Sequence, residues 1–116
     1  EDFYAFMKNG RRVVDGVSVL GAEYIIPFKM YAWLNNIDLK KQGVRVNADD
    51  IKKHKNDVFR LLPLINPDVK IQTVGNVRET VLSFIENMGT ETVADEILSN
   101  RRTKEESLDV FRKIYL

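Results

Sequence analysis

Two neighbouring segments of the chain hold charged side chains whose types and spacing could form a binding or catalytic site. In "NADDIKKHKNDVFRLLPLI", Asp50, His54 and Asp57 stand at i, i+4 and i+7, which places them on one stripe of a helix. Upstream, Lys29 is a lone cation inside the apolar segment "AEYIIPFKMYAWL". An amine, an imidazole and two carboxylates can bind an anionic ligand, or they can form an ordinary solvated face with ion pairs.

Lys29 has a structural and a functional interpretation. At helical spacing it lies near the centre of an apolar arc, where a lysine is rarely buried without a partner. It could extend its stem along the apolar surface and keep its amine in water, or form a structural salt bridge. The functional interpretation is an amine presented to an anionic ligand or to a second domain. About ten residues separate its helix from the next one, so the two helices are expected to be antiparallel neighbours. We therefore predict that the Lys29 amine points toward Asp50, or into the same cleft as Asp50.

The acidic stripe also has a structural interpretation. Asp50 follows Asn47, a good N-cap residue, by three positions, so the two form a variant of the capping box. Asp-x-x-x-His-x-x-Asp spacing can face a metal ion, but no ligand on a second segment is identifiable, and we predict no metal site. His54 is expected to be packed and hydrogen-bonded.

Basic residues surround the stripe and recur elsewhere in the chain. On the same helix they are expected to form mainly a solvated face, and they are Lys52, Lys53, Lys55 and Arg60. Arg11, Arg12 and Arg45 would join them in a phosphate-binding patch if the fold brought them together.

The composition of the chain limits its size class, its partners and its compartment. The chain has 116 residues, of which 44% are hydrophobic and 30% charged, enough for one globular domain with a modest core. The net charge of +1 gives no overall attraction to nucleic acid or membrane. The absence of cysteine fits a reducing compartment, and we expect a cytoplasmic protein. The chain begins without methionine, and we expect it to be part of a longer protein.

Turn, strand and helix signals predict a mainly α (α+β) fold, in one domain over residues 1–116. A short β element at about 10–20, with turns at its Asn-Gly and Asp-Gly pairs and a strand over 16–20, precedes a bundle of about five helices at 22–116. Gly43 is a plausible helix stop, and Thr103 with Glu106 forms a capping box. The helices are expected over about 27–41, 48–65, 76–88, 92–98 and 103–116.

The segment from about Val17 to Ile65 resembles the C-terminal half of the AbiEii-like nucleotidyltransferases, toxin-type and toxin-like members of the DNA polymerase β superfamily. In that family a short strand precedes a helix with a K-x-x-A pattern, matched here by "KMYA" from Lys29. In the family a variable loop follows, and the next helix then begins with an Arg/Lys-Asp-Ile/Leu pattern. Here "DDI" matches this helix start, with Asp50 at the position of the key acid. Asp49 stands where the family has a basic residue, and Lys53 where many members have a further aspartate.

The resemblance implies that Lys29 and Asp50 are catalytic residues lining a nucleotide cleft, with Lys53, His54 and Asp57 binding substrate. Family members hold their metal ions on an N-terminal Gly-Ser…Asp-x-Asp segment, which this sequence lacks. This chain would thus be non-catalytic alone and bind no cofactor itself, and Mg²⁺ and a nucleoside triphosphate would bind with the catalytic half. The implied partners are that half, a cognate antitoxin or an RNA acceptor, and a second copy in a homo-oligomer, without a membrane.

Two expectations accompany this hypothesis. If a catalytic half joins the chain, an exposed apolar patch should mark its contact surface. We expect Phe3, Tyr4, Phe6, Met7 and the strand at 17–20 to form that patch. The alternative is a non-enzymatic helical protein-interaction or regulatory domain, in which Lys29 is only a structural ion pair.

Overall fold

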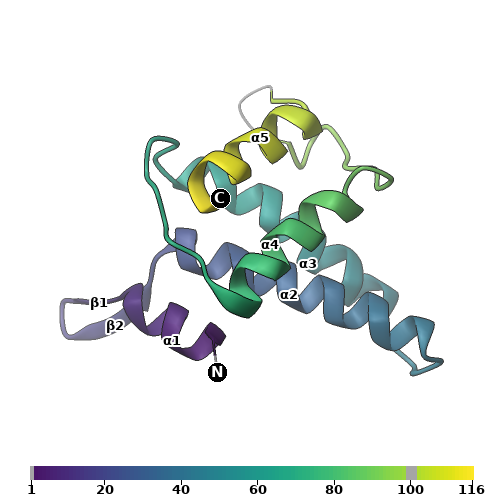
Figure 1. Cartoon of the computed structure of the whole chain (residues 1–116), viewed down its shortest axis with the longest axis horizontal. Coiled ribbons are helices and arrows are strands. Elements are labelled where there is room, and N and C mark those ends of the chain that lie inside the picture. The colour runs from purple at the N-terminus through teal and green to yellow at the C-terminus, as the bar shows by residue number, and fades with distance from the viewer. Residues whose placement is uncertain (1, 99–101) are drawn as a thin grey trace.

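The computed structural model describes residues 2–98 and 102–116, and helices dominate it (Figure 1). A short β-hairpin lies near the N-terminus, as predicted, although a helix also precedes it. The mainly α fold is thus confirmed. The elements in chain order are α1 (Asp2–Asn9), β1 (Arg11–Val14), β2 (Val17–Leu20), α2 (Ala22–Lys41), α3 (Ala48–Leu61), the 3₁₀ helix η1 (Leu62–Leu64), α4 (Gly75–Asn87) and α5 (Lys104–Tyr115).

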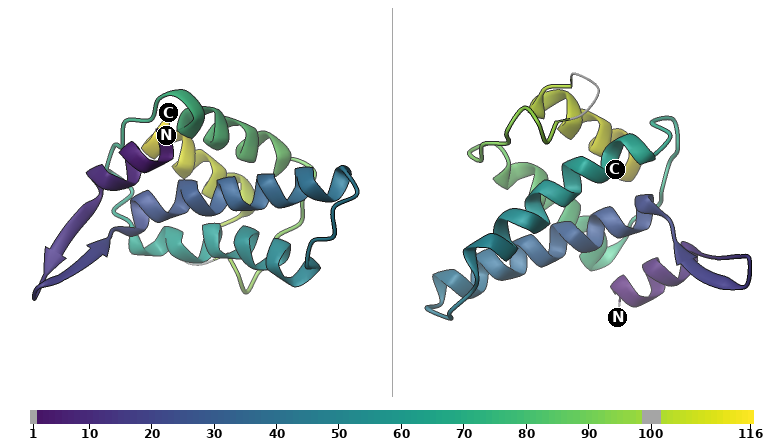
Figure 2. Two further views of the ribbon diagram at one scale, coloured as in Figure 1. Left: turned by 90° about the horizontal axis from the view of Figure 1, so that it is seen from below. Right: turned by 180° about the vertical axis from the view of Figure 1, so that it is seen from behind.

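The hairpin forms where the Asp-Gly turn signal predicts it. Val14 pairs with Val17, and the two turn residues Asp15 and Gly16 both have positive φ, at 51° and 77°. This is the backbone of a type I′ turn, whose twist matches that of the two strands. The hairpin projects from the helical body in all three views (Figures 1 and 2).

Helix α2 begins five residues earlier than predicted, at Ala22 rather than near Pro27. The prediction rested on the backbone donor that a proline removes from a helix interior. It was wrong because another residue supplies the missing donor. Pro27 cannot donate to the carbonyl of Glu23, four residues before it. The Tyr115 hydroxyl, from the last helix, donates to that same carbonyl oxygen at 2.6 Å. Burial raises the pKa of the Tyr115 phenol far above its ordinary value, so the phenol stays protonated and remains a donor.

The end of α2 and the start of α3 follow their sequence signals. Gly43 has φ +86°, and Val44 N–H donates to Leu39 C=O at 3.0 Å, which completes a Schellman motif. The Asn47 side chain caps α3 by accepting from Asp49 N–H at 2.8 Å. The predicted capping box with Asp50 is wrong, because the cap bond goes to the preceding N–H.

The C-terminal part contains one correct and one incorrect helix prediction. The Thr103–Glu106 capping box forms in both directions, at 3.1 and 2.9 Å, and starts α5. Residues 92–98, predicted as a helix, form only a turn. Val93 and Ile97 from this segment are buried, so the apolar spacing reflects packing against the core. Two lysines hold the backbone at the start of this segment, since Lys104 donates to Glu91 C=O and Lys55 to Thr92 C=O.

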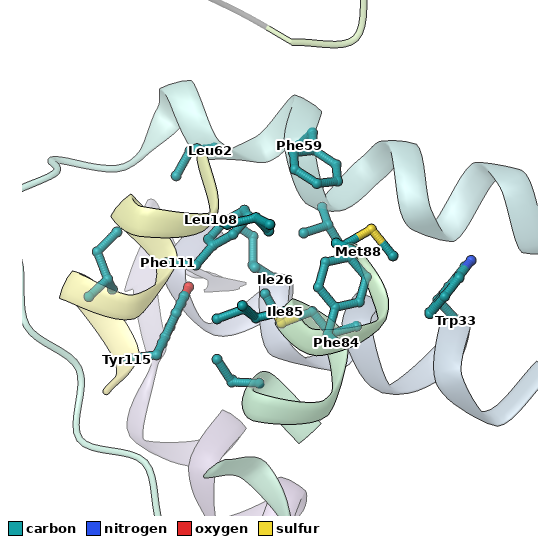
Figure 3. Packing of buried hydrophobic residues seen from close by; sticks show 14 of the residues in the cluster. Ile26, Trp33, Phe59, Leu62, Phe84, Ile85, Met88, Leu108, Phe111 and Tyr115 are labelled. Atoms are coloured by element: carbon teal, nitrogen blue, oxygen red, sulfur yellow. The ribbon is translucent and has the colours of Figure 1, made fainter. Parts of the chain in front are cut away.

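The core lies where α2, α3, α4 and α5 meet, and each of these helices contributes at least one large aromatic ring (Figure 3). Trp33 packs on Phe84 with ring centroids 5.6 Å apart, Phe84 on Phe59 at 6.2 Å, and Phe59 on Phe111 at 5.8 Å. These separations suit tilted or edge-to-face contacts. The rings connect the four helices through one continuous buried cluster. Among the described residues, no helix combines the length and apolar character needed to cross a membrane.

The proline compensation predicts a specific coupling between Tyr115 and Pro27. Tyr115→Phe should lower the free energy of unfolding by about 1–2 kcal/mol, because it leaves the Glu23 carbonyl without a donor. In a Pro27→Ala background the same change should cost clearly less, since the alanine N–H can donate to that carbonyl. Urea denaturation of the four variants measures both values. Equal costs in the two backgrounds would show that the hydroxyl does not replace the missing N–H.

Candidate functional site

Lys29 pairs with an aspartate of the predicted stripe, but not with the one expected. Its Nζ lies 3.2 Å from Oδ2 of Asp57, while Oδ1 of Asp57 lies 3.9 Å from a guanidinium nitrogen of Arg60. The Lys29 side chain is 24% exposed and the Asp57 side chain 19%. The three side chains form a cluster between α2 and α3, the Lys29 cluster, with two cations against one carboxylate. Lys29 and Asp57 are half-buried in it, and Arg60 is 54% exposed.

The antiparallel packing of α2 and α3 explains the change of partner. Lys29 is in the first half of α2 and faces the second half of α3, where Asp57 lies. Asp50 is near the other end of α3, about 10 Å along the helix axis at 1.5 Å per residue, and its side chain is exposed. The first form of the prediction, that the Lys29 amine points toward Asp50, was therefore wrong, and the actual partner Asp57 lies two helical turns further along the same stripe.

Two further candidate residues, His54 on the stripe and Lys53 beside it, lie between these two aspartates along α3. Lys53 is exposed, and His54 is half-buried. The His54 Nδ1 atom is buried without a hydrogen-bond partner, the one side-chain atom of that kind in residues 2–98 and 102–116. His54 is packed as predicted, but the predicted hydrogen bond is not made by Nδ1.

The arginines considered for a phosphate patch are not brought together. Arg12 forms an ion pair with Glu23 at 3.1 Å, and Arg11 borders a groove between β2 and α1. Arg45 lies in the connection between α2 and α3, at the end of the molecule opposite the hairpin (Figure 1). A single patch of these three residues with the α3 cations is therefore excluded by the fold.

Lys55 has a structural role that the sequence interpretation missed. It was assigned to the solvated face, but its amine contacts Glu91 Oε1 at 3.2 Å and Thr92 C=O at 2.9 Å. It therefore fixes the segment after α4 against α3. The available signal was its position: Ile51, Lys55 and Val58 share i, i+4, i+7 spacing, which places Lys55 on the packed face of its helix.

A second candidate surface covers the hairpin and α1. Tyr4 is 72% exposed, Val17 61% and Val19 40%, so part of the predicted set is exposed. Phe6 was wrongly included, because it is buried against the core and its ring packs on Tyr24 at 4.9 Å. Phe3 and Met7 are half-buried.

The Lys29 cluster has hydrogen-bond donors and positive charge that its single carboxylate does not use up. An ammonium group has three donors, and the partly exposed Lys29 needs only one of them for Asp57. Arg60 adds a second cation beside the same carboxylate, so one positive charge is left uncompensated within the cluster. The described residues bring together no set of three or more His, Asp or Glu side chains positioned to hold a metal ion.

Comparison of the chain with protein-family models, with curated proteins and with solved structures finds no match. A functional assignment therefore depends on the residues at 17–65 and on their arrangement in the fold.

The half-buried position of the Lys29–Asp57 pair predicts measurable coupling between the two side chains. In a double-mutant cycle with Lys29→Met and Asp57→Asn, we expect a coupling free energy of about 1–2 kcal/mol from urea denaturation. The exposed pair Arg112–Asp109 on α5 is the control, with an expected coupling below about 0.5 kcal/mol. Equal coupling in the two cycles would mean that solvent screens Lys29 and Asp57 as fully as a surface pair.

Proposed function

We propose that the chain is the helical, nucleotide-cleft-lining portion of a nucleotidyltransferase-like protein and is not catalytic alone. One observation carries this proposal: Lys29 emerges between the buried side chains of Ile26, Met30 and Trp33, yet its amine stays partly exposed and is held by Asp57. An ammonium group in an apolar wall is poorly hydrated, so it interacts strongly with an incoming anion. The resemblance of "KMYA" and "DDI" to the AbiEii-like pattern supports a phosphate as that anion.

In nucleotidyl transfer, negative charge develops on the departing pyrophosphate. A cation fixed near that position stabilises the transition state more than the ground state, which raises the rate. Lys29 would supply this cation. Asp57 would hold the amine in place, which is the role first expected of Asp50.

Asp50, Lys53 and His54 are proposed to contact substrate from the neighbouring turns of α3. Asp50 and Lys53 are exposed and available to a ligand. The unpaired Nδ1 of His54 can accept or donate one hydrogen bond if the ring turns toward the ligand. Asp50 and His54 share the stripe with Asp57, and Lys53 lies beside it, so a nucleotide bound over Lys29 would extend along them.

The residues of this chain do not fit the catalytic metal ions of such an enzyme. A Mg²⁺ site needs carboxylates that converge on one point. Asp57 is already engaged by two cations, and Asp50 is about 10 Å away along the helix. The metal ions and the triphosphate would therefore be held mainly by the proposed catalytic half.

Alanine substitutions test the proposal in the protein that joins this chain to its catalytic half. Lys29→Ala and Asp50→Ala should each lower the rate of nucleotidyl transfer by ~10²-fold or more, by analogy with other preorganised electrostatic groups. Asp50→Ala is the sharper test, because an exposed residue near a helix start contributes only about 0.3–1 kcal/mol to stability. Transfer of a labelled nucleotide and thermal unfolding are measured on the same preparations.

Lys55→Ala is the matched control, since it removes another half-buried lysine of an ion pair, one that joins α3 to the segment after α4. It should lower the melting temperature while leaving transfer nearly unchanged. If Lys29→Ala and Asp50→Ala also leave the rate of transfer nearly unchanged, Lys29 and Asp50 have only structural roles.

A non-enzymatic helical interaction domain is the second candidate. The exposed valines of the projecting hairpin favour it, because contiguous exposed apolar surface marks interaction sites. Under this alternative, binding of a protein partner depends on the hairpin and is insensitive to Lys29→Ala.

A further inference from the structure

The groove between α1 and the hairpin is a candidate site that the proposed function does not use. Its volume is about 420 Å³, within the ~300–1,000 Å³ range of small-molecule pockets. Helix α1 and the hairpin lie next to each other in both views of Figure 2. Both elements line the groove, chiefly through Tyr4, Met7, Lys8, Arg11, Ser18 and Leu20. None of these residues is in α2 or α3, so the groove is separate from the Lys29 cluster.

The strand register shows which face of the hairpin forms one wall of the groove. Directly paired residues of antiparallel strands lie on the same face, and the pairs here are Arg11 with Leu20 and Val13 with Ser18. These four residues therefore share one face. Val13 is 73% exposed, so it continues the apolar surface from the groove toward the turn. On the side of α1, Tyr4 is 72% exposed and adds an aromatic ring to the opposite wall.

The charge of the groove has one sign. Its two charged lining residues are Lys8 and Arg11, and no acidic residue of the described chain lines it. Neither cation takes part in an ion pair within residues 2–98 and 102–116. Two acids of the adjoining elements are engaged elsewhere, because Asp2 accepts from Asn76 N–H at 2.8 Å and Glu23 pairs with Arg12 at 3.1 Å. The groove thus combines apolar walls with two cations available to a ligand.

We propose that this groove binds a small amphiphilic anion. Its apolar body lies between Met7 and Leu20, and its carboxylate or phosphate head is held by Lys8 and Arg11. The guanidinium group offers a planar pair of donors that suits either head group, and the ammonium group adds further donors. This site is independent of nucleotidyl transfer and adds a second ligand to the chain.

Both parts of the ligand are needed. Lys8 and Arg11 are exposed, and exposed ion pairs contribute little because water and salt screen them. An inorganic anion would therefore bind weakly. An apolar body that covers Met7 and Leu20 adds the free energy of removing apolar surface from water. A neutral or cationic amphiphile of the same length lacks the attraction to the two cations.

NMR titration of the labelled chain with short amphiphiles, kept below their micelle concentrations, tests this inference. Octanoate or octyl phosphate should shift the Ser18 and Leu20 amide signals saturably, and the tighter of the two identifies the preferred head group. Acetate, octan-1-ol and octylammonium should each bind at least about fivefold more weakly. Equal binding of octan-1-ol or octylammonium overturns the proposal. It is also overturned if neither octyl anion shifts these signals, or if both shift only residues of the Lys29 cluster.

Charge reversals show whether the two cations hold the head group. Lys8→Glu and Arg11→Glu should each raise the dissociation constant of the tighter octyl anion at least about fivefold, because an attraction becomes a repulsion at close range. Lys113→Glu on α5 is the matched control, since it changes the net charge equally at an exposed position remote in the chain. It should change that constant less than about twofold. Equal effects of the three reversals overturn the assignment of Lys8 and Arg11.

Two tryptophan variants show whether the ligand occupies the groove itself. Ser18→Trp places a large side chain on the hairpin face that lines the groove and should abolish binding of the octyl anion. Val17→Trp places the same side chain on the opposite face of β2 and should leave binding nearly unchanged. Tryptophan is well tolerated in strands. Unchanged binding by the Ser18→Trp variant, or equal loss in both variants, overturns the location of the site.

Discussion

Helix α2 must pack against α1, α3 and α4 while carrying a proline and a lysine in its most buried stretch, and the rest of the structure depends on how these two residues are accommodated. Pro27 leaves the Glu23 carbonyl without its helical donor, and the Tyr115 hydroxyl of α5 supplies one. Lys29 brings a charge into the α2–α3 interface, and Asp57 supplies the opposite charge. The contact that compensates for Pro27 thereby fixes the position of α5, and the contact that compensates for Lys29 fixes the position of α3.

These two compensations connect the core to the proposed site. The Tyr115 contact fixes the first turn of α2, directly after the hairpin, and the Asp57 contact sets the alignment of α2 along α3. A lysine whose stem and partner are both held by packing loses little conformational freedom on binding an anion, which is the advantage of a preorganised group. The hairpin and the Lys29 cluster are both attached to α2. A protein domain that bound the hairpin would therefore have a fixed position relative to the Lys29 cluster.

Much of the fold could be predicted from the sequence because the decisive signals are local. The Asp-Gly turn, the Asn47 cap, the Gly43 stop and the Thr103–Glu106 box each act within a few residues. The errors arose where distant residues decide. The start of α2 depends on Tyr115, 92 positions from Glu23. The partner of Lys29 depends on the alignment of α2 and α3 along their axes, because Asp57 and Asp50 are two helical turns apart on α3. Phe6 and Lys55 were misassigned for the same reason, because their burial comes from packing between elements.

The side-chain resonances of Lys29 report most directly on the central claim that its amine faces a nucleotide phosphate. In the joined protein, a nonhydrolysable nucleoside triphosphate with Mg²⁺ should shift the Lys29 Cε and Hε signals saturably in NMR spectra. The Lys55 signals should stay unchanged, because its amine is engaged by Glu91 and Thr92 on another side of α3. A triphosphate that binds with Lys29 and Lys55 signals equally unaffected would contradict the account.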